Sequence, residues 1–376
     1  MAGVYIHIPF CRALCSYCNF YFTLSEQRKE QMFKAIVKEI KESDDFLAKN
    51  EKIKTLYIGG GTPSLFTVDM LSTLIENVKQ RFEVDHFREV TIETNPDDLT
   101  PDYLRALSQT ECNRLSIGIQ SFNDDILKFL NRRHDSVGAI KAVEEAQKQG
   151  FNNLSLDLIY GIEGQTLEMI QSDLKTMLSL APTHISAYHL TIEERSLLWK
   201  MLQRGEISQV DESVSESHFS YVSEHLIKGG FEHYEVSNFA KKGYKALHNS
   251  AYWESIPYIG FGPSAHSFNG QNIRRWNVAS NLRYLRSIES GECQYETETL
   301  SITERVDEEI MTRLRSNKGV DLDMIAAKYG ANFVTEIMSS AKPFIKSNLL
   351  IFENNILRIE PKNFLKSDYI IGKLFL

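Results

Sequence analysis

The sequence has no long apolar run and no excess of basic charge. No stretch reaches the roughly 18 consecutive apolar residues that a membrane span needs, and residues 1–10 lack the basic start and long apolar core of a secretory signal. Asp and Glu (50 residues) outnumber Lys and Arg (42), so the formal net charge of -8 gives no broad basic field for nucleic acid. We therefore expect a cytoplasmic protein that does not bind nucleic acid.

Cysteine is also scarce, because the 376 residues contain only five, too few and too unevenly spaced for a disulfide framework. Three of them, Cys11, Cys15 and Cys18, fall within eight positions. Clustering of this kind indicates a metal site. Cys112 and Cys293 lie far away in the sequence, and we expect Cys112 to be a small buried apolar side chain and Cys293 to be a loop thiol.

Length and composition favour a globular chain with more than one unit. A length of 376 residues allows two or three domains, or one barrel of about 250 residues plus an appendage. Hydrophobic residues (42%) and charged residues (24%) have the proportions usual for soluble globular proteins, which argues against a disordered chain.

Short runs of β-branched and aromatic residues predict six buried strands. These runs are 4–8, 55–58, 89–92, 114–119, 154–158 and 185–190. Between them, apolar residues recur at helical spacing, for instance Phe33, Ile36, Val37 and Ile40. Such alternation implies parallel pairing with right-handed crossovers. The predicted fold class is α/β, with an open, partial (β/α)6 barrel of TIM-like type.

Polar residues and glycines close four of the predicted strands, where the chemistry of such a barrel gathers. They are the segment 59–62, Glu93, Gln120 and Asp157. Each of them alone could equally be part of a polar turn. Because the carboxyl ends of parallel strands meet at one edge, we expect these residues to converge there.

The barrel is predicted to span residues 1–230, followed by two further units. Residues 231–300, rich in Gly, aromatic residues and His, are interpreted as a connecting and covering segment. Residues 301–376 show three helical patterns and a hairpin signal at Asn354-Asn355, which predicts a smaller α+β domain resembling a winged helix. This unit has 11 Lys or Arg residues against 10 Asp or Glu, so packing or docking is expected rather than DNA binding.

The Cys11-x3-Cys15-x2-Cys18 loop directly follows the first predicted strand. Three thiolates this close can hold one face of a 4Fe–4S cluster and leave one iron without a protein ligand. Such an iron could be chelated by the amino and carboxylate groups of a methionine derivative, and electron transfer into that ligand can start radical chemistry. A zinc site and a two-cysteine redox loop are the alternatives, although zinc prefers four closed ligands.

Five motifs in their order resemble the radical S-adenosylmethionine superfamily, and within it the oxygen-independent coproporphyrinogen III oxidase group. The motifs are YIHIPFCRALCSYC at 5–18, GGGTP at 59–63, ETNP at 93–96, SIGIQSFN at 116–123 and DLIYG at 157–161. The resemblance runs nearly end to end and implies a barrel of radical S-adenosylmethionine type with a C-terminal domain like that of the oxidase group. It implies a 4Fe–4S cluster and S-adenosylmethionine as cofactors.

The resemblance also implies site residues by position. Cys11, Cys15 and Cys18 would ligate the cluster. The residues that would line S-adenosylmethionine are Tyr5, Tyr17, Gly60, Gly61, Thr62, Glu93, Gln120, Arg132 and Asp157. Glycine lets backbone amides approach a ligand closely, a carboxylate suits an ammonium or a ribose hydroxyl, and an Arg suits a carboxylate. The resemblance assigns no catalytic residue.

Phe20 and a second motif place the chain in one branch of the group. The oxidases resemble CxxxCxxCxC, whereas Phe20 stands two positions beyond Cys18. The branch with Phe there is similar to the HemW-type haem chaperones, whose HNxxYW motif stands here as HNSAYW at 248–253. Imidazole is a common axial ligand of haem iron, so His248 is the predicted haem ligand and His266 the second candidate. The alternative for His248 is a structural histidine that is hydrogen-bonded at a turn.

The expected function is therefore haem binding and delivery of haem to respiratory haem proteins, rather than catalysis by a coproporphyrinogen oxidase. The alternative is a radical oxidase that decarboxylates two propionate groups of coproporphyrinogen, and a third reading is a radical enzyme on an unrelated substrate. Expected partners are haem and its acceptor proteins. The sequence leaves open whether the chain forms a homodimer and whether its C-terminal unit contacts a membrane. Other histidines, such as His218 and His225, lie in a polar helical pattern and are expected to be solvated.

Overall fold

The structure is a computed structural model that describes residues 1–291 and 295–376, so Cys293 lies outside the described residues. Six parallel strands form its centre, in the order of the sequence. They are β1 (Ala2–Ile8), β2 (Ile53–Gly60), β3 (Glu89–Thr94), β4 (Arg114–Gln120), β5 (Leu154–Tyr160) and β6 (His184–His189). All six predicted strands are confirmed, and they form the partial barrel that the alternation of strands and helices implies.

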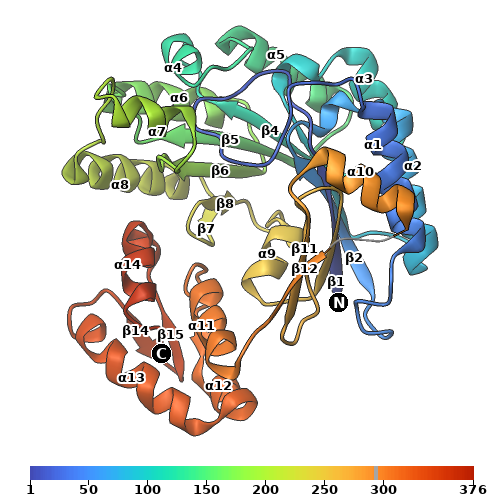
Figure 1. Cartoon of the computed structure of the whole chain (residues 1–376). Helices are drawn as coiled ribbons and strands as arrows, with labels where there is room; N and C mark the ends of the chain where they lie inside the picture. The colour runs from blue at the N-terminus through green and yellow to red at the C-terminus, as the bar shows by residue number, and fades with distance from the viewer. Residues whose placement is uncertain (292–294) are drawn as a thin grey trace.

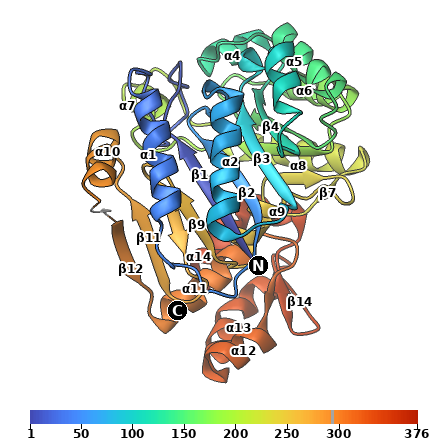
Figure 2. The same cartoon turned by 90° about the vertical axis from the view of Figure 1, so that its right-hand side faces the viewer.

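Helices between these strands cover the outside of the curved sheet (Figure 1). They are α1 (Lys29–Glu42), α2 (Val68–Phe82), α3 (Pro101–Leu107), α4 (Asp124–Phe129), α5 (Ser136–Lys148) and α6 (Leu167–Ser179). Thr67, Thr100 and Thr166 each cap a helix by accepting a hydrogen bond from a backbone amide three residues on. Figure 2 shows α1 and α2 side by side over β1 and β2.

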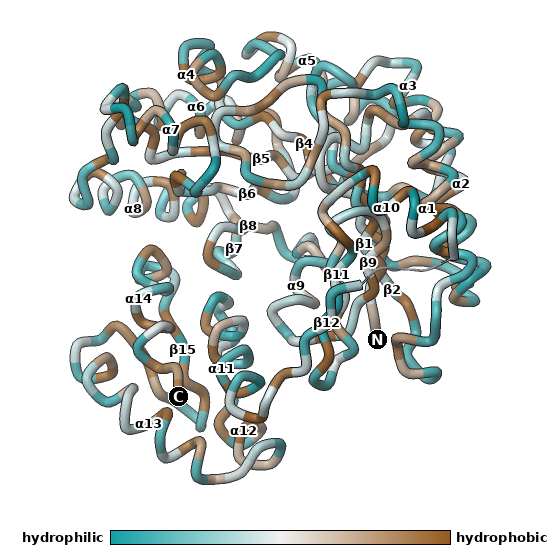
Figure 3. Tube along the Cα trace, in the orientation of Figure 1, coloured by the Kyte–Doolittle hydropathy of each residue, from teal (hydrophilic) through white to brown (hydrophobic). Residues whose placement is uncertain are grey.

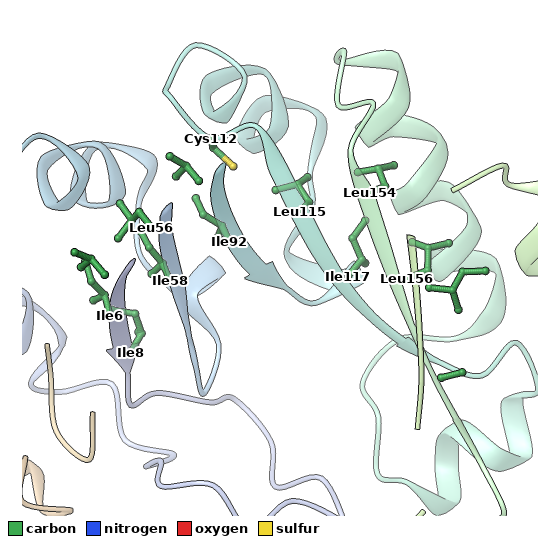
Figure 4. Packing of buried hydrophobic residues seen from close by; sticks show 14 of the residues in the cluster. Ile6, Ile8, Leu56, Ile58, Ile92, Cys112, Leu115, Ile117, Leu154 and Leu156 are labelled. Carbon is green, nitrogen blue, oxygen red and sulfur yellow. The ribbon is translucent and has the colours of Figure 1, made fainter. Parts of the chain in front are cut away.

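The core between helices and sheet is built from every second residue of the strands. Ile6, Ile8, Leu56 and Ile58 are fully buried there, and Figure 4 shows them in line with Ile92, Ile117 and Leu156 from the next strands. Cys112 belongs to this cluster with 6% of its surface exposed, as expected for a small apolar side chain. Because strand residues alternate between faces, the intervening residues of each strand point into the barrel.

The segment after residue 230 does more than connect and cover, because it extends the same sheet at both ends. The strand β9 (Tyr258–Phe261) pairs in parallel with β1, and β10 (His266–Phe268), β11 (Ile273–Asn277) and β12 (Tyr295–Thr299) follow as antiparallel strands. At the other end, β8 (Asn238–Ala240) pairs with β6 and β7 (Glu232–His233) pairs with β8. Within the described residues, the central strands are therefore part of a 12-stranded sheet.

Two further helices follow β6 before residue 230, and two more lie in the described residues between β8 and β12. They are α7 (Leu197–Gln203), α8 (Glu212–Lys228), α9 (Leu247–Trp253) and α10 (Asn281–Ser290). His218 of α8 is 3% exposed, so the expectation that it is solvated is wrong. Figure 3 shows hydrophobic and hydrophilic residues alternating along α1, α2 and α8, as expected for helices that pack with one face only.

The last part of the chain folds into the expected helices and hairpin. The helices are α11 (Ile302–Arg313), α12 (Leu322–Tyr329), α13 (Ala331–Lys346) and α14 (Ser367–Gly372), and the strands β13 (Val320–Asp321), β14 (Ile351–Glu353) and β15 (Ile356–Arg358) form one small sheet. Asn354 and Asn355 both have positive φ (52° and 60°), which is the geometry of a two-residue hairpin turn. Figure 1 shows this unit below the sheet, next to α9.

Backbone and side-chain contacts attach this C-terminal unit to the barrel. The amide of Val236 donates to the carbonyl of Arg315, and the amide of Asn317 donates to the carbonyl of Tyr234. Arg274 of β11 also forms an ion pair with Glu308 of α11. Among the described residues, no helix is long and apolar enough to cross a membrane.

Candidate functional site

A cavity of about 450 Å³ lies at the carboxyl ends of the central strands, beside the cysteine loop. Eleven of the thirteen predicted site residues line it: Cys11, Cys15, Tyr17, Cys18, Gly60, Gly61, Thr62, Glu93, Gln120, Arg132 and Asp157. The parallel strands bring these positions together from distant parts of the sequence, as expected at this edge of a barrel. We call this space the first cavity.

The cysteine loop is held on both sides. The amide of Cys11 donates to the carbonyl oxygen of Thr23, and the amide of Thr23 donates to the carbonyl oxygen of Pro9. These two hydrogen bonds close the loop against the end of β1. The hydroxyl of Thr62 donates to Sγ of Cys11 at 3.6 Å, and the guanidinium of Arg132 donates to Sγ of Cys15 at 3.4 Å. Two of the three sulfurs therefore already receive hydrogen bonds that stabilise a thiolate.

Burial, in contrast, disfavours the thiolate form of these cysteines. Desolvation raises the pKa of Cys11 to about 12, more than the hydrogen bond from Thr62 lowers it, and desolvation also raises the pKa of Cys18. A cysteine has to lose its proton to bind a metal, so a bound metal has to supply the charge that stabilises the thiolates here.

A polar chain connects Cys11 with Cys15 across the cavity, through a residue that the sequence prediction missed. Arg132 donates to the side-chain oxygen of Asn95 at 2.6 Å, and Asn95 donates to Oγ1 of Thr62 at 3.1 Å. Asn95 therefore positions both residues that contact the cysteine sulfurs. It stands two residues after Glu93 in the ETNP motif, so the motif contained the signal.

Gly60 and Gly61 allow the cysteine loop to pass close to β2. A Cβ atom on Gly61 would lie 2.5 Å from the carbonyl oxygen of Phe10 and 2.9 Å from Sγ of Cys11. Gly60 has a φ of 110°, and a Cβ atom there would lie 2.7 Å from the ring of His7. No side chain fits at either position without displacing the loop or β1, so the glycines set the width of this part of the cavity.

Two enclosed carboxylates face the first cavity from β3 and β5. Glu93 accepts a hydrogen bond from the hydroxyl of Tyr57 at 2.6 Å and from the amide of Gly60 at 3.1 Å, and Asp157 accepts from the hydroxyl of Ser116 at 3.2 Å. Desolvation raises the pKa of both, and the negative charge of Glu93 helps to raise that of Asp157 to about 7. A cation that enters the cavity would stabilise the charged form of both carboxylates.

Gln120 ends β4 in a strained conformation. Its φ of 71° lies in the left-handed region, and the pairing of β4 with β5 is irregular between Ile117 and Gln120. Non-glycine residues in this region are uncommon and concentrate at functional sites. The bend turns the amide of Gln120 toward Gly118, where an added Cβ atom would lie 2.9 Å from its nitrogen.

His189, at the end of β6, is a second residue of this cavity that the sequence prediction missed. Its Nε2 atom is buried without a hydrogen-bond partner among residues 1–291 and 295–376. The rule that pointed to Glu93, Gln120 and Asp157 applies equally to the end of β6, so applying it there would have found His189.

A second cavity of about 510 Å³ is lined by residues of β1, β9, β10 and β11 and by residues of α9 and α11. Seven of its fifteen lining residues are aromatic, and Tyr5, Tyr252 and Trp253 are among them. Tyr5 therefore faces the second cavity, and its hydroxyl contacts Nδ1 of His7 at 3.0 Å. Its expected contact with S-adenosylmethionine stays a prediction.

Phe20 borders both cavities. It stands where the oxidase pattern has a fourth cysteine, and it is 70% exposed, which is unusual for a phenylalanine. Phe20 is therefore the part of the wall that a ligand in either cavity would meet.

His248, the predicted haem ligand, lies on α9 but lines neither cavity. It is 1% exposed, its Nδ1 atom contacts the hydroxyl of Thr55 at 2.9 Å, and its Nε2 atom contacts the hydroxyl of Tyr252 at 2.8 Å. Both ring nitrogens are engaged, so neither is available to iron in this conformation. His248 holds α9 against the sheet, and Tyr252 and Trp253 of the same motif reach the second cavity.

The donor set of the first cavity fits an iron–sulfur cluster. It offers three cysteine sulfurs of intermediate exposure, two of them with hydrogen-bond donors, and a glycine cradle beside Cys11. In the described part of the chain, no group of three or more His, Cys, Asp or Glu side chains is arranged to hold a single metal ion.

Comparison with protein families identifies the class of fold to which this chain belongs. Residues 5–177 match the Radical SAM superfamily, and residues 300–365 match the HemN C-terminal domain. A solved structure of coproporphyrinogen III oxidase (HemN) from Escherichia coli superposes with a TM-score of 0.84, covers 100% of this chain and 90% of the other, and is 22% identical. The chain thus has the radical SAM fold with a separate C-terminal domain.

Two relatives identify the family to which the chain belongs within this class. Heme chaperone HemW from Lactococcus lactis subsp. lactis is 31% identical over 375 residues, which cover 100% of this chain and 97% of that protein. Heme chaperone HemW from Bacillus subtilis is 33% identical over 356 residues, 93% of each chain. The chain belongs to the HemW family of heme chaperones.

Proposed function

We propose that this chain is a haem chaperone that holds a 4Fe–4S cluster with S-adenosylmethionine in the first cavity and passes bound haem to respiratory haem proteins. The proposal rests above all on the convergence of eleven predicted site residues on one cavity. Membership of the HemW family supports the haem part of the proposal, since the relatives are named heme chaperones.

In this proposal Cys11, Cys15 and Cys18 hold three irons of the cluster. When bound there, the cluster would supply one electron to a sulfonium compound, and the iron without a cysteine would be open to chelation by amino and carboxylate groups of that compound. Thr62 and Arg132 donate hydrogen bonds to two of the sulfurs and so favour the thiolate form.

The remaining residues of the first cavity bind S-adenosylmethionine. Glu93 and Asp157 supply the negative charge that a sulfonium and an ammonium group require, and Gln120 offers amide hydrogen bonds. Tyr17 lies under Arg132, whose guanidinium contacts its hydroxyl at 3.4 Å. The backbone of Gly60 and Gly61 allows close approach where no Cβ atom intrudes.

Haem delivery needs a site for a large flat ligand apart from the cluster. The second cavity meets this need with aromatic walls, and the HNxxYW helix α9 contributes Tyr252 and Trp253 to it. His248 supports this helix from behind. We propose that the C-terminal unit, which contributes Glu308 and Thr312 to the cavity wall, takes part in docking the acceptor.

Haem binding and cleavage of S-adenosylmethionine should be measured in one anaerobic sample. Protein with a reconstituted cluster is expected to bind haem with a Soret band, more tightly than an unrelated protein of similar size. Haem bound no better than by the unrelated protein would overturn the chaperone function. Cys15→Ala serves as the matched sample without a cluster.

The second candidate is an oxygen-independent coproporphyrinogen III oxidase, favoured by the structural likeness to HemN over the whole chain. Phe20 argues against it, because the oxidase pattern has a cysteine at this position. Incubation with coproporphyrinogen III would decide between the two. Release of methionine and 5′-deoxyadenosine in step with decarboxylated product would favour the oxidase, and their absence is expected.

A further inference from the structure

The second cavity contains one imidazole whose ring has no hydrogen-bond partner. His266 of β10 is exposed toward this cavity, and within residues 1–291 and 295–376 its ring makes no hydrogen bond. The ring stacks on the indole of Trp276, with 5.6 Å between centroids and 21° between planes. This stacking holds the imidazole plane in place without using either nitrogen, as an axial metal ligand requires.

The other imidazoles near the cavity are engaged. Nδ1 of His7 contacts the hydroxyl of Tyr5 at 3.0 Å, and its Nε2 contacts the carbonyl oxygen of Tyr21 at 2.8 Å. His248 lies outside the lining with both nitrogens in contact with hydroxyl groups. Of the three, only His266 offers a nitrogen to a ligand without breaking existing contacts.

The tyrosines of the cavity are poorer ligands. A phenol has to lose its proton to bind iron, and desolvation raises the pKa of both Tyr5 and Tyr258. A neutral imidazole needs no such change. Desolvation by the cavity walls and the positive charge of Arg274 both lower the pKa of His266, so it stays neutral.

The cavity also has one cation suited to a carboxylate. Arg274 of β11, which pairs with Phe268 of β10, lines the cavity and forms an ion pair with Glu308 of α11, another lining residue. The side chain of Arg274 is 34% exposed, so another carboxylate can reach it. A haem has an iron for an imidazole, an apolar ring for aromatic walls and propionates for an arginine.

The geometry points to His266 as the axial ligand of haem in the second cavity, with Arg274 bound to a propionate in exchange for Glu308. This inference rests on the proposed haem binding and assigns the residues that perform it. The cavity volume of about 510 Å³ lies within the range of roughly 300–1,000 Å³ usual for cofactor sites. Occupation of Arg274 by a propionate would also release one ion pair between the barrel and the C-terminal unit.

Ligand substitution in the full-length protein with its cluster tests the iron ligand. His266→Ala is expected to weaken haem binding at least about tenfold and to remove the imidazole signature from the EPR and resonance Raman spectra of ferric haem. Free imidazole should restore that signature. His248→Ala should keep it, and His86→Ala, at an exposed position outside both cavities, should match the wild type in affinity and spectra.

The outcomes separate this inference from the chaperone function. If the wild type binds haem but His266→Ala keeps the imidazole signature, the inference is overturned and the chaperone function stands. If the wild type does not bind haem, the chaperone function fails. The iron–sulfur absorption of each variant reports whether the fold is intact, and His266→Met, expected to give an altered ligand spectrum, replaces His266→Ala if that variant is unstable.

Opposite charge changes test the propionate contact. Arg274→Gln is expected to weaken haem binding about threefold, whereas Glu308→Gln should tighten it by a similar factor because it leaves Arg274 free. A purely structural ion pair would weaken haem binding in both variants, and that result would overturn the exchange. Arg88→Gln, at an exposed position outside both cavities, is the control.

Discussion

The two cavities differ in almost every physical respect. The first contains three thiols and two enclosed carboxylates at the ends of parallel strands, and its walls are joined by hydrogen bonds between side chains. Nearly half of the residues that line the second are aromatic, from β1, the cysteine loop, α9, β9 and β10, and the C-terminal unit adds Glu308 and Thr312 to its wall. The first therefore concentrates ionisable groups held by hydrogen bonds, whereas the second offers more aromatic surface and fewer charges.

This difference means that the two sites should respond independently to most substitutions. Ligands in the first cavity depend on coordination and charge, which one atom can abolish. Ligands in the second depend on a contact area shared by many rings, so single changes there should have graded effects. The exception is Phe20, which belongs to both.

Loss of one cluster cysteine is expected to have the largest effect. Cys15→Ala should abolish the iron–sulfur absorption, because three sulfurs are the fewest that can hold the cluster with one open iron. Iron and sulfide analysis and the absorption spectrum measure this. Cys112→Ala is the control, expected to cost about 1 kcal/mol of stability as a core residue and to keep the cluster. Equal loss in both variants would mean that the metal lies elsewhere.

Substitution of Gly61 by alanine is expected to have the second-largest effect. Its Cβ atom would lie 2.5 Å from the carbonyl oxygen of Phe10, so Gly61→Ala has to push the cysteine loop away from β2. Iron content after reconstitution is expected to fall to a small fraction of the wild-type value, while haem binding in the second cavity persists. Gly372→Ala adds its methyl group to open space and should change neither. Full iron content in Gly61→Ala would contradict the close packing of the loop.

S-adenosylmethionine binding should depend on pH through Asp157. Its pKa is raised to about 7, so below pH 7 it is protonated in the absence of the ligand, and binding of a cation has to release that proton. Affinity is therefore expected to weaken as the pH falls from 7 to 6, by up to about tenfold per unit. Equilibrium dialysis measures this, and Asp157→Asn should flatten the profile. Equal slopes in the two proteins would assign the titration to another group.

Truncation of the Phe20 side chain, which lines both cavities, is expected to have the smallest effect. Phe20→Ala is expected to weaken haem binding a few-fold through lost apolar contact, and to make haem affinity depend on whether S-adenosylmethionine is present. Haem titrations with and without S-adenosylmethionine test this. Phe352→Ala removes an exposed ring from the C-terminal unit and is the control. If Phe20→Ala behaves like Phe352→Ala, the two cavities are independent.

The sequence predicts the first cavity well and the second poorly, for a physical reason. The strands β1 to β6 carry local periodicity, and residues that end parallel strands must meet, so Glu93, Gln120 and Asp157 could be placed together. The walls of the second cavity meet only through long-range pairing, such as that of β9 with β1, and the short strands β9 to β12 have no pattern of their own. No local signal placed His266 beside Tyr5.

Two histidines show the same limit of prediction from the sequence. His218 stands in a polar helical pattern, yet α8 turns it inward to 3% exposure. His248 stands in a motif that suggests a ligand, yet both of its nitrogens are engaged by hydroxyl groups from β2 and α9. Burial and hydrogen bonding of a histidine depend on which neighbours the fold supplies, and the sequence around it does not contain them.

The position of Phe20 has a consequence for sequence changes at the end of the cysteine loop. Its side chain contributes to the lining of both compartments, and 70% of its surface is exposed. One substitution at this position therefore alters the lining of both compartments at once.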